Sequence, residues 1–561
     1  MDDNRAAMIR RLLLSMPLLF VAGFLCYPLA AIAHLSLYEG SSLQVLLADD
    51  YYPRVLGFSL WQAGVSTILT LVTGLPLAYL LAHYRFRGRG VMYALVTVPF
   101  VMPTVVTAAG FAALLGSNGL VSAGLQSLLG DQAPTINVTN TLGIVLLAHV
   151  FYNYGVVVRI VGGVWATFDP RLTQAAAILG ASPLRTFLHV TLPLLLPAIG
   201  AAALLVFIFT FGSFGVMLLL GGPRLATLEV EIYRQTAQLL RLDIAAALAI
   251  VQMLVTLLAT LVYTRLTARA AVRDLRSADR QRPVRTVCER LVHGAGWLVT
   301  ILLSAPLAAL VVRSLMPLSR GAEGGPTLAY YRMLGENQRG SFFFVSPLTA
   351  IGNSLLMALV ATLVALVIGI AAAYLLARSA DLRYRHGGAF GQLAALADPL
   401  FMLPLGASAV TLGLGYVVAF GRLGMLQAIW LIPVAHALLA FPFVVRGILP
   451  ALRAIDPRLR DAARVLGATP WRIVWWIDLP LLLPALLAAA ALAFTVSLGD
   501  YGAALLLARP DMPTVPVVIG RLLGQPGAAN YGQALALSSI LMLVTIAASR
   551  MIEGIARIRL R

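Results

Sequence analysis

The chain has no lysine, and all 41 of its basic residues are arginine. The phosphate-binding P-loop of many ATPases needs a lysine to reach the nucleotide phosphates, so this chain cannot contain such a loop. Charged residues of either sign are also scarce, at 11% of the chain against roughly 25% in a soluble domain. This composition excludes a water-soluble globular enzyme, and any ATP hydrolysis has to be supplied by another chain.

Cysteine and histidine are few and scattered. Cys26 and Cys288 lie far apart in the sequence and indicate neither a disulfide framework nor a metal site. No two of the seven histidines have the spacing of zinc ligands, so the sequence predicts no metal and no cofactor in this chain. The net charge of +18 is compatible with nucleic-acid binding, but the arginines lie next to apolar segments. We therefore interpret the charge as a feature of membrane topology and expect no nucleic-acid partner.

Long segments without charge make up much of the chain. Residues 12–38, 91–130, 132–158, 186–223 and 479–499 contain no Asp, Glu, Lys or Arg. Charge-free apolar segments of about 20 residues predict membrane-spanning helices, because a helix satisfies its backbone hydrogen bonds internally where water is absent. The first of these segments is long and lacks a clear small-residue cleavage site, which favours a span over a signal peptide.

The sequence thus predicts an all-α polytopic membrane protein embedded in the lipid bilayer. With the N-terminus in the cytoplasm, 30 arginines fall on the cytoplasmic side and 11 on the outer side. Positively charged residues gather on the cytoplasmic side of membrane proteins, so both termini are expected there. About twelve spans are expected, near residues 12–34, 57–82, 91–115, 141–163, 194–220, 243–264, 292–312, 350–377, 393–420, 426–449, 481–507 and 533–550.

The two halves of the chain are repeats of each other. LAHVFYNYGVVVRI (147–160) aligns with VAHALLAFPFVVRG (434–447), which places His149 opposite His436 at an offset of 287. Further upstream, Ser59 matches Ser354 at an offset of 295. Equivalent loops are six spans apart and so face the same side of the membrane. The fold expected is therefore two parallel six-helix repeats, related by an axis along the membrane normal.

The repeat also predicts the domain boundaries. We expect one transport domain at residues 55–264 and a second at 348–551, separated by a polar, arginine-rich cytoplasmic linker at 265–290. The remaining segments are an N-terminal tail with the first span at 1–54, the seventh span with a periplasmic segment at 291–347, and a basic cytoplasmic tail at 552–561.

The most informative repeated feature is the cytoplasmic loop after the fourth span of each half. It reads QAAAILGASPLRTFLHVTLP at 174–193 and DAARVLGATPWRIVWWIDLP at 461–480. In both copies, small residues predict a short helix that another backbone can approach. A glycine then permits a sharp turn, and a Ser or Thr before a Pro begins a second helix. A further proline is expected to break that second helix before the next span. These residues are Gln174, Ala175, Ala176, Gly180, Ser182, Pro183 and Pro193 in the first copy and Asp461, Ala462, Ala463, Gly467, Thr469, Pro470 and Pro480 in the second.

The pattern resembles the EAA loop of the permease subunits of binding-protein-dependent ABC importers. The resemblance implies a type I ABC importer (MetI-like) transmembrane fold in one chain. It also implies two copies of an ATPase subunit, which bind ATP and Mg²⁺ and contact Gln174–Gly180 and Asp461–Gly467, and a periplasmic or extracellular solute-binding protein. The family's glutamate at the head of the motif is Gln174 in one copy and Asp461 in the other, so the first copy lacks that charge.

Further segments resemble the fused two-domain permeases of the thiamine and iron(III) importers, over about residues 55–550. They are LLAHVFYN (146–153), LGGPRLATLEVEIYRQ (220–235) and SLGDYGAALLL (497–507). The segment FSLWQA (58–63) is slightly more similar to the thiamine permeases. The resemblance thus implies a permease of the bacterial inner membrane that imports a small solute, with thiamine expected and iron(III) as the alternative.

Polar residues within apolar spans are candidates for the solute pathway, because burying them in a membrane is costly. Asp500 follows a long apolar segment, and its counterpart in the first half is Ser213. Tyr152 and Asn153 lie in the fourth span. A structural role is the alternative for each of them, and for Asp500 it would be that of a buried acid satisfied by tyrosine or backbone.

Other interpretations of the acidic residues stay open at this level. Glu229 and Glu231 belong to the outer loop 221–242, where they would contact a binding protein or, as we favour, order the loop. An ion-coupled secondary transporter also has internal repeats, but Asp500 is the one strong mid-span candidate for binding an ion. A membrane-embedded enzyme is less compatible with the sequence, since no cluster of His, acidic and nucleophilic residues is present. The chain itself is therefore expected not to be an enzyme.

Overall fold

The computed structural model describes residues 15–38, 42–130, 136–270, 281–317, 325–336, 346–385 and 389–558. In these ranges, eleven helices are long and apolar enough to span a membrane. A helix pair bent by 100°, Ala397–Gly406 and Ala409–Gly421, makes a twelfth if it is counted as one span. The expected number of spans is confirmed.

The secondary structure is almost entirely helical, and η denotes a π-helical turn. In chain order, the first half contains η1 (Ala22–Cys26), α2 (Tyr27–Tyr38), α3 (Ser42–Ala48), α4 (Tyr51–His83), β1 (Tyr84–Arg85), α5 (Arg89–Val101), α6 (Thr104–Leu115), α7 (Leu120–Leu129), α8 (Leu142–Trp165), α9 (Pro170–Ile178), α10 (Pro183–Thr186), η2 (Phe187–Thr191), α11 (Leu192–Phe211), η3 (Met217–Gly221), α12 (Leu228–Tyr233), η4 (Arg234–Gln238) and α13 (Leu242–Ala270). The second half contains β2 (Arg282–Pro283), α14 (Val287–Ser314), α15 (Ala329–Met333), α16 (Pro347–Arg385), α17 (Ala389–Gly406), α18 (Ala409–Gly421), α19 (Leu431–Ala454), α20 (Pro457–Val465), α21 (Pro470–Ile473), η5 (Val474–Asp478), α22 (Leu479–Gly499), α23 (Gly502–Leu507), α24 (Val515–Leu523) and α25 (Ala528–Ile558).

The main helices of the two halves correspond, as the repeat predicts. Helix α4 packs along α8 in the first half, and α16 packs along α19 in the second. The aligned serines make the same contact, because Ser59 Oγ accepts the N–H of Leu228 at 2.9 Å and Ser354 Oγ accepts the N–H of Val515 at 2.8 Å. These matching bonds fix α12 against α4 and α24 against α16.

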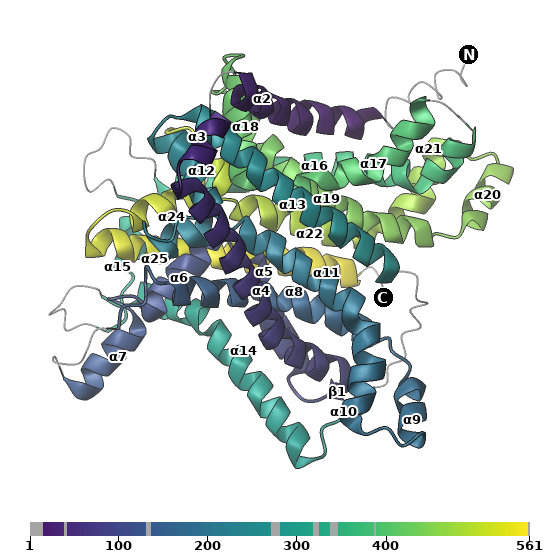
Figure 1. Cartoon of the computed structure of the whole chain (residues 1–561), viewed down its shortest axis with the longest axis horizontal. Coiled ribbons are helices and arrows are strands. Elements are labelled where there is room, and N and C mark those ends of the chain that lie inside the picture. The colour runs from purple at the N-terminus through teal and green to yellow at the C-terminus, as the bar shows by residue number, and fades with distance from the viewer. Residues whose placement is uncertain are drawn as a thin grey trace.

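The first helix of each half packs on the other half. In Figure 1, the purple helix α2 lies at the top beside the green α18, while the teal α14 lies at the bottom near the blue α6. Aromatic rings hold α2 in place, since Phe24 lies 6.2 Å from Phe420 and 5.9 Å from Trp430 between ring centroids. The N-terminal end of α14 is also held against the first half, because β2, which precedes this helix, pairs in parallel with β1. This exchange interlocks the two halves.

Among the residues that the structure describes, three apolar clusters form the interior. One is built mainly from α16, α17, α19 and α22 of the second half and one from α4, α8 and α11 of the first half. The third joins both halves and contains Phe214 and Tyr501, whose stacked rings are 5.7 Å apart. The outer faces stay apolar too, as at Leu258, which is 65% exposed. Such a surface suits a lipid environment.

The expected third span, 91–115, is not a single helix. The chain breaks at Met102 and Pro103, where Pro103 has a ψ of 140° and cannot continue the helix before it, so α5 and α6 are separate. The second half bends at the equivalent place, after Pro404. The paired breaks shape the space between the halves.

The expectation that Pro193 and Pro480 end a helix is wrong. The chain stays helical through them, over Pro183–Phe211 and Pro470–Gly499. Each proline lies in the first turn after a π-helical turn, η2 or η5. The wider π turn makes room for a proline ring that would clash in a regular α-helix.

Candidate coupling helices and central cavity

We call residues 169–191 the first elbow and residues 456–478 the second elbow. Each begins with an aspartate that caps a nine-residue helix. Asp169 Oδ1 accepts the N–H of Arg171 at 3.0 Å, and Asp456 Oδ1 accepts the N–H of Arg458 at 2.9 Å. Sequence reasoning did not predict these caps, although the aligned Asp-Pro-Arg in both copies is their signal.

The turn and the second cap of each elbow follow the sequence-based expectation. Gly180 has a φ of +80° and Gly467 a φ of +78°, which is the left-handed region that favours glycine. Ser182 then caps α10 and Thr469 caps α21, each with its hydroxyl 3.4 Å from the backbone nitrogen three residues ahead. The repeated sequence therefore gives two elbows of the same shape.

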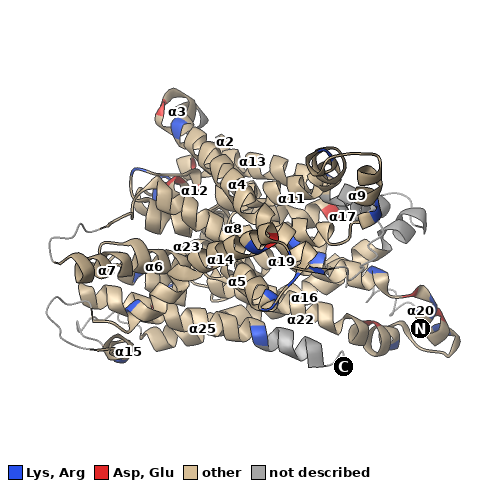
Figure 2. Cartoon of the chain, turned by 90° about the horizontal axis from the view of Figure 1, so that it is seen from below, with Lys and Arg blue, Asp and Glu red and all other residues tan. Residues whose placement is uncertain are grey.

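Both elbows extend from the same end of the molecule, as Figures 1 and 2 show for α9 and α20. Neither of these helices has a buried residue. Each ends in a pair of apolar side chains that are almost fully exposed, with Ile178 and Leu179 at 86%, Val465 at 88% and Leu466 at 86%. Paired apolar side chains on a protruding helix are typical of a surface that binds a partner.

The two elbows differ in charge. Asp461 in the second elbow accepts a hydrogen bond from Arg464 at 2.7 Å on the exposed face of α20. At the equivalent places the first elbow has Gln174 and Ala177, so it has neither member of this pair.

The second elbow also has an anchor that the first lacks. Arg460 Nε donates to the buried Asp478 at 2.8 Å, and the Tyr374 hydroxyl of α16 donates to the other oxygen of Asp478 at 2.7 Å. In the first half, Thr191 stands in place of the acid. Tyr79, the counterpart of Tyr374, instead packs on His83 and Trp165 at centroid distances of 4.6 and 5.2 Å.

A cavity of about 290 Å³ lies between the two halves. All four of the predicted pathway residues, Tyr152, Asn153, Ser213 and Asp500, line it. Its walls come from α5, α8 and α11 of the first half and from α18, α19 and α22 of the second. Residues that are far apart in the sequence therefore meet at one site that both halves line.

Two equivalent histidines lie at or beside the cavity: His149 lines it, and its counterpart His436 contacts the lining residue Asp500. His149 Nδ1 lies 3.0 Å from Ser66 Oγ, and its Nε2 lies 2.9 Å from Ser213 Oγ. His436 Nδ1 lies 2.8 Å from Ser497 Oγ, and its Nε2 lies 3.1 Å from Asp500 Oδ2. Sequence reasoning aligned the two histidines but did not include them among the pathway residues. Their aligned positions in the repeat, with His149 three residues before Tyr152, were the available signal.

The other predicted residues are held mainly by backbone atoms. Asn153 donates to His149 O at 3.0 Å and is 2% exposed. The Tyr152 hydroxyl donates to Met102 O at the break between α5 and α6. Asp500 Oδ2 also accepts the N–H of Ala504 at 3.0 Å, so this acid is satisfied by histidine and backbone rather than by tyrosine.

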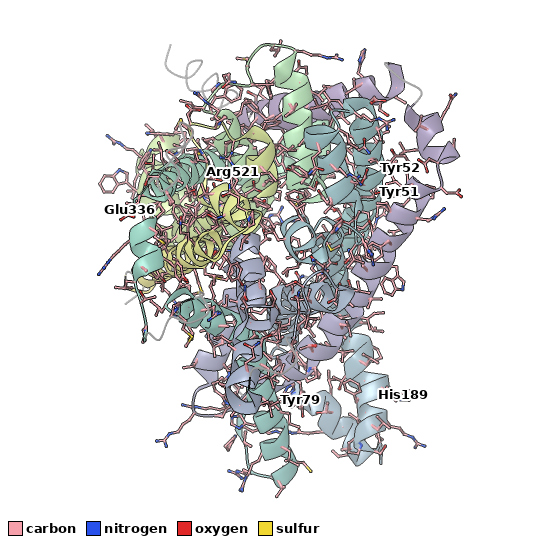
Figure 3. The ribbon with its side chains drawn as sticks, turned by 90° about the vertical axis from the view of Figure 1, so that its left-hand side faces the viewer. Tyr51, Tyr52, Tyr79, His189, Glu336 and Arg521 are labelled. Carbon is pink, nitrogen blue, oxygen red and sulfur yellow. The ribbon has the colours of Figure 1, made fainter. Side chains whose placement is uncertain are left out.

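The acidic residues of the outer loop are both buried, so neither is accessible to a binding protein. Glu231 orders the loop, accepting from the Tyr51 hydroxyl at 2.9 Å (labelled in Figure 3) and from Gln235 at 2.6 Å. Glu229 is 0% exposed and lines the cavity, where Gln252 donates to it. Glu229 is thus a cavity residue that the sequence placed in an outer loop.

A comparison with protein families matches residues 74–272 and 295–557 to the family described as the binding-protein-dependent transport system inner membrane component. The chain belongs to this family. It is therefore a multi-pass membrane permease subunit of a bacterial ABC importer with two repeated domains, and it is not itself an enzyme. The family implies partner ATPase and binding-protein subunits. No group of three or more His, Cys, Asp or Glu side chains in the described ranges is placed to hold a metal ion.

Several curated relatives are similar over most of their length. The thiamine transport system permease protein ThiP of Escherichia coli is 28% identical, with 85% of this chain and 84% of that protein covered. A probable ABC transporter permease protein, y4fN of Sinorhizobium fredii, is 28% identical, at 89% and 88% coverage. The ferric transport system permease protein FbpB of Actinobacillus pleuropneumoniae is 25% identical, at 94% and 76% coverage.

Proposed function

We propose that this chain forms the whole transmembrane part of an importer that carries thiamine into the cytoplasm, with one ATPase subunit docked on each elbow. The observation that carries the proposal is the pair of exposed elbows, equal in shape and placed at one end of the molecule. Two elbows of the same shape can each bind one copy of the same ATPase subunit. The exposed apolar pairs at Ile178–Leu179 and Val465–Leu466 supply the contact area for them.

The solute would pass between the halves through the cavity, with Asp500, Ser213, Asn153 and Tyr152 on its wall. Thiamine is favoured because permeases named for thiamine are 28% identical to this chain over 84% of their length. Iron(III) is the second candidate, since a permease named for ferric transport is 25% identical. Membership of the ABC importer family decides against the ion-coupled secondary transporter.

The direct test is uptake by the reconstituted importer. The chain, its ATPase and its binding protein are placed in proteoliposomes, and uptake of labelled thiamine and of iron(III) is measured with and without ATP. ATP-dependent uptake of thiamine supports the proposal, while ATP-dependent uptake of iron(III) alone would replace thiamine by the second candidate. Uptake driven by an ion gradient without ATP would overturn the proposal.

We further propose that the elbows and both termini lie on the cytoplasmic side of the bacterial inner membrane. The support is the arginine distribution of 30 against 11. In a variant without Cys26 and Cys288, a cysteine at Ile178 should react with an impermeant reagent only from the cytoplasmic side. A cysteine at Ser127, in α7 at the opposite end of the molecule, should react only from outside. The reverse pattern would contradict the assignment of the elbows.

A further inference from the structure

We infer that the central cavity is itself a solute-binding site and that it selects an organic cation with a flat aromatic ring. This inference rests on the proposed function and deepens it, because it assigns recognition of the solute to the permease as well as to the binding protein. The support comes from the charge of the cavity, the state of its two acids and the nature of its walls.

The cavity is acidic in a strongly basic chain. Two acidic residues, Asp500 and Glu229, are among the residues that line it, and no arginine in the described part of the chain does. The acids are not equivalent in the repeat, since Asp500 corresponds to Ser213 and Glu229 corresponds to Pro516. Each half therefore contributes one acid, from a different element. An acidic lining in a low-dielectric site favours a cation over an anion or a neutral solute.

Within the described ranges, the hydrogen bonds to Asp500 go to one of its oxygens, Oδ2. Oδ2 meets both His436 Nε2, at 3.1 Å, and the N–H of Ala504, at 3.0 Å. The histidine is in turn held at 2.8 Å by Ser497. Oδ1 takes part in neither bond, and the Asp500 side chain keeps 8% of its surface exposed. A carboxylate fixed in this way presents one oxygen to a solute in the cavity.

Glu229 has an incomplete set of donors. Gln252 donates to Oε1, whereas Oε2 is buried without a hydrogen-bond partner in the described part of the chain. Burial raises the pKa of Glu229 to about 8, although the side chains of Ser408 and Gln252 lower it. Ionising a buried acid is costly, and a nearby cation favours the ionised form, so a cation bound in the cavity would stabilise the Glu229 carboxylate.

Aromatic rings from both halves complete the walls. Phe100 lies 6.5 Å from Tyr152 and 5.8 Å from Phe209, and Phe209 lies 6.5 Å from Phe443 of the second half, between ring centroids. Tyr501, the residue after Asp500, adds a further ring to the cavity lining. Ring faces attract organic cations and stack on flat rings. A multivalent metal ion gains most from oxygen ligands, so this row of rings favours an organic aromatic cation over iron(III).

The test is direct binding to the purified permease–ATPase complex in nanodiscs, with no binding protein present and labelled thiamine as the probe. We expect saturable binding by the wild type. Asp500→Asn and Glu229→Gln should each reduce the affinity by about tenfold or more, because each replaces an acid that can ionise beside a bound cation with a neutral amide of the same shape. Phe443→Leu should also weaken binding, because it removes a ring while keeping an apolar side chain.

The matched control is Asp511→Asn, an acid outside the cavity. Asp511 pairs with Arg509 at 2.6 Å, and the hydrogen bond from this guanidinium lowers the pKa of the Asp511 carboxyl. The substitution thus removes a comparable charge, and thiamine affinity should stay unchanged. A neutral thiamine analogue with carbon in place of the charged ring nitrogen should bind weakly to the wild type and equally weakly to Asp500→Asn. Folding of every variant is checked by co-purification of the ATPase subunits.

Three outcomes would overturn the inference. The first is that Asp500→Asn and Glu229→Gln bind thiamine with the same affinity as the wild type. The second is that the neutral analogue binds as tightly as thiamine. The third is that iron(III) displaces thiamine. If the importer takes up thiamine normally while the permease–ATPase complex binds none, the inference fails and the proposed function stands. If thiamine is not taken up, yet another aromatic cation binds in a way that depends on Asp500, the thiamine assignment fails and the cation site stands.

Discussion

Gly467 is the position where one substitution should disable the second elbow and leave the membrane core intact. Its φ is +78°, and a Cβ added there would meet no atom within 4 Å. The cost of a side chain therefore arises in the backbone, at roughly 1–2 kcal/mol for an L-residue in the left-handed region. That energy lowers the equilibrium ratio of the native turn to other turn conformations by roughly five- to thirtyfold, since each 1.4 kcal/mol is about a factor of ten.

Gly467→Val should therefore reduce ATP-driven uptake by roughly five- to thirtyfold, while the protein still inserts into the membrane. ATP hydrolysis should become uncoupled from transport, because α20 and α21 no longer hold their relative orientation. Both quantities are measured in parallel in proteoliposomes that contain the ATPase and the binding protein. Gly180→Val should act in the same way at the first elbow, where φ is +80°.

The matched control at the same position is Gly467→Asn, because asparagine tolerates the left-handed region. This variant should keep most of the uptake. Unchanged uptake in Gly467→Val would mean that the elbow does not transmit movement. An equal loss in the Val and Asn variants would show that the ATPase excludes any side chain there, and the backbone argument would be refuted.

Three further substitutions test the surfaces and bonds described above. Leu466→Glu should lower ATPase affinity by about tenfold or more in a pull-down titration and leave thermal stability unchanged, because Leu466 is 86% exposed. Asp478→Asn should destabilise the solubilised protein by about 3 kcal/mol in thermal unfolding, because it leaves Arg460 without its buried partner. Ser354→Ala should cost about 1–3 kcal/mol in the same assay, because it leaves the N–H of Val515 without an acceptor.

For each of these three substitutions, a different result would contradict the stated reason. Full ATPase affinity in Leu466→Glu would place the docking surface elsewhere. An unchanged melting temperature in Asp478→Asn would show that the anchor of the second elbow carries no net stability. Ser59→Ala is the internal comparison for Ser354→Ala, since its bond to the N–H of Leu228 is equivalent, and a clearly different cost would contradict the equivalence of the halves.

The sequence predicted the features that depend on short stretches of chain. Charge-free segments gave the number of spans, because the membrane acts on each segment through its own hydropathy. The elbows followed from Gly180, Gly467 and the Ser-Pro and Thr-Pro pairs, because turns and caps are set by neighbouring residues. The offset of 287 then paired the halves and placed Ser213 opposite Asp500. The same local reasoning wrongly predicted a helix break at Pro193 and Pro480, because the π-helical turns before them could not be recognised from the sequence.

Features that join distant segments were decided only by the tertiary structure. No local pattern shows that α2 packs on the opposite half, that Asp478 pairs with Arg460 and Tyr374, or that Glu229 turns from an outer loop into the cavity. The sequence aligned His149 with His436 and Ser213 with Asp500, but only packing brought His149 Nε2 to Ser213 and His436 Nε2 to Asp500. The physical reason is that hydropathy and turn preferences act along the chain, whereas the contacts that define a site form when helices far apart in sequence pack together.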